Sequence, residues 1–261
     1  MTKTNKNKNL FKKIYDFLIL MISIAGYVPK NATIFRTIAM VASLAMAIYL
    51  GNYQPDNSSL AISYFFLLEA LYLGFITIML SENGLRHWFI KKSGDENNGY
   101  LAFEAILGFL FFHNGVSIGY IASSNSGGLF NFINKDLLLI IVAIMFICGF
   151  TIKILATKAV TVDIYYWKDM FLGKKISDFV ITGPYKYFKN PMYGIGQLQA
   201  YAIAIWYGST YGLMAALINQ LLIFSFYYLV EKKFIKRVYQ KKILQPILVK
   251  QPIVKQPVEF F

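Results

Sequence analysis

The sequence is poor in charged residues, and poorest in acidic ones. Only 15% of its 261 residues are charged, against about 25% in an average soluble domain. Lys and Arg number 26 and Asp and Glu only 13, so the formal net charge is +13. This shortage argues against an ordinary soluble globular protein. The basic surplus fits a membrane with an anionic lipid surface better than it fits nucleic acid.

Cysteine is almost absent as well. Cys148 is the single cysteine and lies in an apolar run, so no disulfide can form within the chain. The two histidines form no cluster with cysteine at the spacing of metal ligands. A disulfide scaffold and a structural zinc site are therefore excluded, and we expect no metal.

Long apolar runs, in contrast, are abundant, since 57% of the residues are hydrophobic. They lie at about 34–50, 60–80, 101–122, 137–157 and 192–230. Each run approaches or exceeds the roughly 20 residues that a bilayer helix needs. A turn at Gly208, Ser209, Thr210 and Gly212 divides the last run into two spans. The pattern predicts an all-α, polytopic transmembrane bundle of about six spans that ends in a helical hairpin.

A further apolar stretch near the N-terminus is shorter. Residues 14–28 contain Asp16 and follow five lysines, and the stretch ends in a poor signal-peptidase site, so we interpret it as an interfacial or partly inserted helix. With six spans, 25 of the 26 basic residues share one face and only Lys135 lies on the other. If residues 14–28 cross instead, the N-terminal lysines change sides. The first arrangement is favoured, and it places both termini in the cytoplasm.

The segment from about 158 to 190 is both aromatic and basic. Anchoring at the membrane interface explains most of this mixture. At its end, Asn190 and Pro191 predict a helix start, with an N-cap acceptor and a preset backbone angle. Gly194 and Gly196 would let a ligand or a neighbouring helix approach the first turn, where free N–H groups favour an anion. A well-capped, tightly packed helix without a ligand is the alternative.

The C-terminal half resembles a known family. Residues 183–193 read Gly-Pro-Tyr-Lys-Tyr-Phe-Lys-Asn-Pro-Met-Tyr, and residues 229–239, after the hairpin, read Leu-Val-Glu-Lys-Lys-Phe-Ile-Lys-Arg-Val-Tyr. This arrangement resembles the integral-membrane phospholipid methyltransferases and the related isoprenylcysteine carboxyl methyltransferases. Gln220, the Tyr207-Gly208 turn and the tyrosine eight residues after Glu231 look most like phosphatidylethanolamine N-methyltransferases.

The likeness covers about residues 155–240, where residues 165–171 (Tyr-Tyr-Trp-Lys-Asp-Met-Phe) look like an upstream segment of the family. The chain departs from the family at two positions. Lys168 stands where a glycine is usual, and Glu231-Lys232 stands where several members have two acidic residues.

The resemblance implies methyl transfer from S-adenosylmethionine to a membrane phospholipid, namely the amine of phosphatidylethanolamine or its methylated forms. It also implies a cytoplasm-facing site on the hairpin, in a bacterial inner membrane or the endoplasmic reticulum. The implied catalytic residues are Glu231, Asp169 and Tyr193. The implied cofactor-binding residues are Tyr185, Lys186, Lys189, Asn190, Pro191, Met192, Tyr193, Gly194, Gly196, Tyr227 and Glu231. Aromatic faces would stabilise the sulfonium, and cations or free amides would bind the carboxylate.

The two legs of the hairpin have similar lengths. From Pro191 to Gly208 is 17 steps and from Gly212 to Glu231 is 19, so each leg spans about 27 Å and both end at one membrane face. Glu231 should therefore lie beside the turn at residues 190–196.

Three other functions stay open. They are a carboxyl or thiol methyltransferase, a non-catalytic protein that kept the fold, and a transporter, which the absence of internal repeats disfavours. Glu69 and His113 fall in the middle of spans, where ionisable groups suggest function or, alternatively, a Glu–His hydrogen bond between helices. Asn219 and Gln220 are expected to bind neighbouring helices.

The expected division of the chain has four parts. A basic tail and interfacial helix occupy residues 1–33, and four transmembrane helices occupy residues 34–157. The aromatic loop, the hairpin and the catalytic segment occupy residues 158–244. A Gln-Pro-rich tail occupies residues 245–261 and carries no assigned chemistry.

Overall fold

The computed structural model describes residues 3–53 and 57–240. This part of the chain is helical and contains no strand, which confirms the predicted all-α class. The long helices are α1 (Lys3–Ile24), α2 (Ile34–Tyr53), α3 (Ser58–Leu80), α5 (Glu96–Ser124), α6 (Lys135–Val160) and α10 (Thr210–Phe226). The short ones are η1 (Pro29–Asn31), α4 (Arg86–Ser93), α7 (Val162–Tyr165), α8 (Lys168–Leu172), η2 (Gly183–Lys186), η3 (Ile195–Gln197), α9 (Leu198–Trp206), η4 (Tyr227–Glu231), α11 (Lys232–Ile235) and η5 (Lys236–Gln240).

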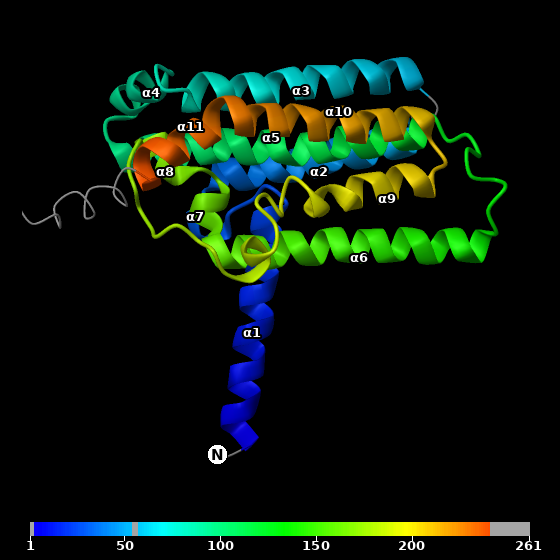
Figure 1. Ribbon diagram of the computed structural model, residues 1–261, viewed down its shortest axis with the longest axis horizontal. Helices are drawn as coiled ribbons and strands as arrows, with labels where there is room; N and C mark the ends of the chain where they lie inside the picture. The colour runs from blue at the N-terminus through cyan, green and yellow to red at the C-terminus, as the bar shows by residue number, and fades with distance from the viewer. Residues whose placement is uncertain (1–2, 54–56, 241–261) are drawn as a thin grey trace, which may run out of the picture.

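The bundle is built around α5. Helices α2, α3 and α10 pack along α5, and α6 lies at the outside against α9 (Figure 1). The side chains of α5 are correspondingly well buried, whereas many on α6 are exposed, among them Ile140, Ile144 and Ile147. In a bilayer these exposed apolar side chains face lipid and not water, so α6 is a membrane-spanning helix at the periphery of the bundle.

Five helices of the described chain are long and apolar enough to cross a membrane. They cover Ile34–Asn52, Ser58–Leu80, Glu96–Ser124, Lys135–Val160 and Thr210–Tyr239, the last running without a break through α10, η4, α11 and η5. Together with the apolar composition they make this an integral membrane protein. The sequence predicted six spans. The leg before the Gly208 turn contains η3 and α9, of 3 and 9 residues, and is too short to cross alone.

Helix α1 leaves the bundle at a steep angle to the long helices (Figure 1). If the long helices span the bilayer, α1 lies along its surface, as expected of an interfacial helix. It begins at Lys3, well before the predicted start at residue 14. Its end is held to the aromatic segment, where the hydroxyls of Tyr165 and Tyr166 donate to the carbonyls of Ile24 and Ser23 at 3.3 and 2.8 Å.

Polar side chains inside the bundle pair with one another between helices. The Asn114 and Asn219 amides donate to one oxygen of Glu69 at 2.8 and 2.7 Å. His113 instead bonds to the Tyr64 hydroxyl at 2.5 Å and to Ser43 at 2.9 Å. The Glu69–His113 hydrogen bond considered from the sequence is therefore wrong. His113 and Asn114 are consecutive on α5 and point about 100° apart, so when Asn114 faces Glu69, His113 faces Tyr64 and Ser43 instead. Asn219 does bind neighbouring helices, as predicted.

The two ends of the bundle differ in what they carry. Helices α4, α7, α8 and α11 gather at one end, and α6 begins with Lys135 at the opposite end (Figure 1). The turn at Gly208, a glycine with a positive φ of 57°, lies at that opposite end beside Gly128 and Leu129. The Gln-Pro-rich tail at residues 245–261 lies outside the described residues.

Candidate functional site

A cavity of about 460 Å³ opens at the end of the bundle that carries α7, α8 and α11. Its size falls within the usual range for small-molecule sites, about 300–1,000 Å³. The wall comes from segments far apart in the chain: α3, α5 and α6, the stretch from α7 to η3, and the long C-terminal helix. The polar side chains that line it include Glu231, Asp169, Lys153, Lys189 and Asn190.

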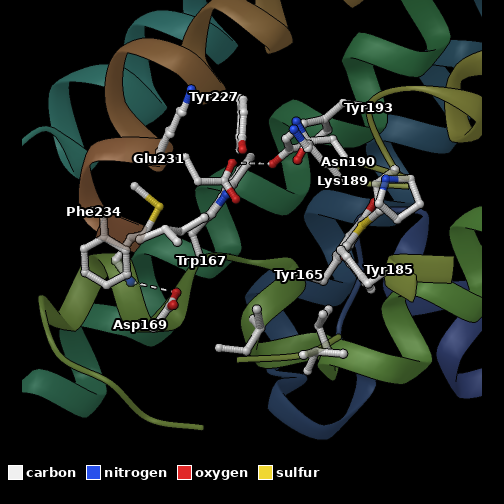
Figure 2. A pocket seen from close by; sticks show the side chains of 18 of the residues that line it. Tyr165, Trp167, Asp169, Tyr185, Lys189, Asn190, Tyr193, Tyr227, Glu231 and Phe234 are labelled. Atoms are coloured by element: carbon white, nitrogen blue, oxygen red, sulfur yellow. Dashed lines mark hydrogen bonds between the residues drawn. The ribbon is translucent and has the colours of Figure 1, made fainter. Parts of the chain in front are cut away.

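Glu231 lies at the centre of this polar group (Figure 2). The Tyr193 hydroxyl donates a hydrogen bond to Glu231 Oε2 at 2.7 Å, and the Trp167 side chain lies close to the same carboxylate (Figure 2). The sequence-based expectation that Glu231 lies beside the turn at residues 190–196 is confirmed by the contact with Tyr193. A carboxylate held by a neutral donor is oriented but keeps its charge available to a ligand.

The helix that carries Glu231 is irregular where it borders the cavity. It changes to π-helical geometry over Tyr227–Glu231 and again over Lys236–Gln240. A π turn adds one residue per turn and is frequent at functional sites. Tyr227 and Glu231, the first and last residues of the first π segment, both line the cavity. Nothing in the apolar sequence of this helix indicates the irregularity.

Asp169 is the second carboxylate of the cavity and is buried. Its two oxygens are both occupied, because Met170 N–H donates to Oδ1 and the Tyr239 hydroxyl donates to Oδ2, each at 2.8 Å. Burial raises the pKa of Asp169, and the hydrogen bonds from Tyr239 and Met170 offset part of that rise. The bond to Tyr239 also ties the end of the C-terminal helix to α8.

Aromatic rings form much of the remaining wall. The Phe111 ring stacks on Tyr165 and Trp167, with centroids 5.5 and 6.1 Å apart. Trp167 has a left-handed backbone with φ of 51°, which is unusual for a large side chain and is typical of strained positions at functional sites. Burial and the nearby Glu231 charge raise the pKa of Tyr185, which keeps its hydroxyl protonated.

The predicted helix start at Asn190-Pro191 is wrong. Residues 190–194 form a turn, and α9 begins only at Leu198, after the short η3. Gly194 has ψ of −102°, which interrupts a helix. Its N–H donates to the Asn190 carbonyl at 2.9 Å, and the Gly196 N–H donates to the Pro191 carbonyl at 2.8 Å. Both N–H groups are therefore bonded within the turn. The expectation that they would be free to bind a ligand is wrong.

Gln220 stabilises the unusual turn from the opposite helix. Its side-chain amide donates to the carbonyls of Tyr193 and Gly194 at 2.9 and 3.3 Å, and its own oxygen accepts from Tyr201 at 2.7 Å. Gln220 therefore binds a neighbouring segment, as predicted. Asn190, at the other end of the turn, lines the cavity together with Tyr227 of η4.

All three residues predicted to be catalytic line the cavity, and so do most of those predicted to bind cofactor. The residues it brings together are Asp169, Tyr185, Lys189, Asn190, Pro191, Met192, Tyr193, Tyr227 and Glu231. Lys186, Gly194 and Gly196 are not part of the lining. Lys186 instead extends over the Tyr187 ring, 5.7 Å from its centroid.

Sequence reasoning missed several residues of the wall. Tyr72, Phe111 and Lys153 lie within predicted spans, where an apolar run does not tell which side faces a cavity. Trp167 and Tyr239 lie inside the segments that carried the family resemblance, and that position was the one available signal for them.

Most of the cavity-lining segments lie in the part of the chain that resembles known proteins. Residues 137–242 match the model of the phospholipid methyltransferase family. The predicted resemblance is therefore confirmed for this segment, which covers less than half of the chain. The remaining wall residues, Tyr72 and Phe111, come from helices outside it.

A curated relative supports the same family. Over 96 residues the chain is 28% identical to a phosphatidylethanolamine N-methyltransferase of Eremothecium gossypii. The match covers 37% of this chain and 11% of that relative, so the chain resembles a small part of a much longer protein. No solved structure matches the chain significantly. Both comparisons therefore place the resemblance of this segment in the phospholipid methyltransferase family.

Proposed function

We propose that this protein is an S-adenosylmethionine-dependent phospholipid N-methyltransferase and that phosphatidylethanolamine or its methylated forms are the acceptors. The observation that carries the proposal is the Glu231 carboxylate, held by Tyr193 beside Trp167 in an aromatic-walled cavity whose lining falls mostly within the segment that matches the phospholipid methyltransferase family.

The lining fits the cofactor. Tyr185, Tyr227 and Trp167 offer aromatic faces for a sulfonium cation. Lys189 is a cation for a carboxylate, and Asn190 is a polar partner for hydroxyls or the amino group. When bound, S-adenosylmethionine supplies an electrophilic methyl group. The task of the protein is then to hold the acceptor in line with it and to exclude water, since orientation alone accounts for a large part of such a rate enhancement.

The acceptor amine must lose a proton before its lone pair can attack. Glu231 is a better base than Asp169, because each oxygen of Asp169 already accepts a hydrogen bond, from Met170 or Tyr239, whereas the bond from Tyr193 reaches Oε2 of Glu231. Glu231 would take the proton, and Tyr193 would hold the carboxylate toward the amine. Asp169 then acts by positioning the C-terminal helix.

The division of the chain into four helices at residues 34–157 and a catalytic segment at residues 158–244 stays a proposal. The cavity draws residues from both parts.

Purified protein in phosphatidylethanolamine vesicles should transfer label from S-[methyl-³H]adenosylmethionine into extractable lipid. Glu231→Gln should lower the rate by at least about 100-fold, as the loss of a general base does. Glu96→Gln is the matched control, because Glu96 is exposed and pairs with Lys174 away from the cavity. Absence of labelled lipid with every phosphatidylethanolamine derivative would exclude the proposal, and equal rates for both variants would exclude Glu231 as the base.

A further inference from the structure

Lys153 lines the cavity from α6, and no part of the proposed function uses it. Among residues 3–53 and 57–240, no ion pair and no side-chain hydrogen bond involves its ammonium group. A cation inside a membrane helix is costly unless it meets an anion or water. The cavity is therefore where its ammonium group meets water or an anionic ligand.

Membrane orientation does not account for Lys153. A lysine that only follows the positive-inside rule extends into open water, as Lys158 does one turn further along α6, where it is exposed. Lys153 is only half-exposed and faces the cavity, while Ile147 and Leu155 on the same helix are exposed toward lipid. Its stem packs against the turn at residues 190–196, since a Cβ added at Gly196 would lie 3.8 Å from Lys153 Cβ.

Lys153 stands apart from the other charges of the cavity. Glu231, Lys232 and Lys236 come from the C-terminal helix, and Asp169, Asp178 and Lys189 come from the stretch between α7 and η3, whereas Lys153 comes from α6. Such a layout suits a zwitterion, with its amine at Glu231 and its anion at Lys153. A phospholipid headgroup with an amine is such a zwitterion.

We propose that Lys153 is the phosphate-binding residue of the acceptor-lipid subsite. Its ammonium group donates to a phosphodiester oxygen and so places the headgroup amine toward Glu231. This assignment rests on the proposed methyl transfer to a phospholipid amine. It makes Lys153 a determinant of lipid affinity and leaves cofactor affinity to other groups.

The test compares Lys153→Met with Lys158→Met, which removes a lysine of the same helix from outside the cavity lining. The initial rate is measured against the mole fraction of phosphatidylethanolamine in mixed micelles, and S-adenosylhomocysteine binding is measured by calorimetry. We expect Lys153→Met to raise the apparent KM for lipid about tenfold, as loss of a charge-assisted hydrogen bond does, with S-adenosylhomocysteine affinity within twofold of the parent. Lys158→Met should change neither quantity, and Lys153→Arg should restore part of the lipid affinity.

A binding arm separates the two proposals. Calorimetry with dihexanoyl phosphatidylethanolamine and with dihexanoylglycerol, which lacks the phosphate, measures the preference for phosphate without turnover. If the parent protein binds the phospholipid in a Lys153-dependent way but transfers no methyl group, the methyl transfer fails and the subsite stands. If Lys153→Met leaves the lipid KM and this preference unchanged, or weakens S-adenosylhomocysteine binding instead, the phosphate assignment is wrong.

Discussion

At the scale of single residues, the site depends on a few hydrogen bonds between distant parts of the chain. Tyr193 and Glu231 are separated by 38 residues and meet at 2.7 Å, and Asp169 and Tyr239 are separated by 70 residues and meet at 2.8 Å. Each bond joins the segment before η3 or the segment of α8 to the C-terminal helix. Losing one donor in such a site leaves a carboxylate under-solvated and misdirected.

Tyr193→Phe removes one donor to Glu231 while keeping the ring. We expect methyl transfer about tenfold slower, because a hydrogen bond to a charged group contributes about 1.5–3 kcal/mol. The rate is measured by label transfer to lipid at saturating cofactor. Tyr27→Phe also loses a hydroxyl bond, to Thr37, and neither residue belongs to the cavity lining, so this variant should leave the rate unchanged. A Tyr193→Phe rate equal to that of the parent would show that the bond does not orient Glu231.

The stability of the protein should depend on pH through Asp169. Burial raises the pKa of Asp169. Between the ordinary pKa of an aspartate and this raised pKa, the folded state therefore binds more protons than the unfolded state. The free energy of unfolding falls as the pH rises through this interval. Asp169→Asn removes this contribution, so the melting temperature of the variant relative to the parent should increase from pH 4 to pH 8. Thermal unfolding in detergent measures it, and a difference that does not vary with pH would contradict the assignment.

At the scale of elements, the cavity is positioned by how α6 meets η3 and α9. Gly149 makes the crossing possible, because a Cβ there would lie 2.7 Å from Gln199 N and 3.3 Å from Leu198 Cβ. The close approach brings Lys153, one turn further, beside the turn at residues 190–196. Small residues serve the same purpose at other membrane-helix contacts.

Gly149→Leu should force α6 and α9 apart and lower the free energy of unfolding by about 1–3 kcal/mol, the usual cost of overpacking. Gly115→Leu is the matched control, because nothing lies within 4 Å of a Cβ at Gly115. Unfolding in a detergent titration provides the measurement. If both variants unfolded at the same detergent fraction, the close contact of α6 with α9 at Gly149 would not contribute to stability.

At the scale of the whole molecule, the two ends of the bundle have different chemistry. The cavity, α4, α8 and α11 occupy one end, and the loop after α5 and the turn at Gly208 occupy the other (Figure 1). Lys135 is the basic residue that begins α6 at the end without the cavity. By the positive-inside rule the cavity end would face the cytoplasm.

Cysteine accessibility tests this orientation in a Cys148→Ala background. Asn97→Cys lies at the cavity end and Ser126→Cys at the opposite end, and both positions are exposed. In intact cells, a membrane-impermeant maleimide should label Ser126→Cys, and it should label Asn97→Cys only after permeabilisation. The reverse pattern would place the cavity outside the cytoplasm.

The amino-acid sequence by itself determined the class and the general location of the site. A run of about 20 apolar residues has one stable form in a bilayer, a helix, so the predicted spans at 60–80, 101–122 and 137–157 agree closely with α3, α5 and α6. Glu231 lies beside Tyr193, as predicted, but not because the two legs are helices of equal length: residues 190–194 form a turn, and α9 begins only at Leu198.

Only the tertiary structure decided which side of each helix faces which neighbour. Apolar residues surround a membrane helix on all sides, so the sequence does not specify the rotation of the helix about its axis. That rotation directs Glu69 to Asn114 and Asn219, and not to His113, and turns Lys153 toward the cavity. The bend at Gly194 could not be predicted from the local sequence either. It depends on Gln220 of another helix, whose side chain donates to the carbonyls of Tyr193 and Gly194.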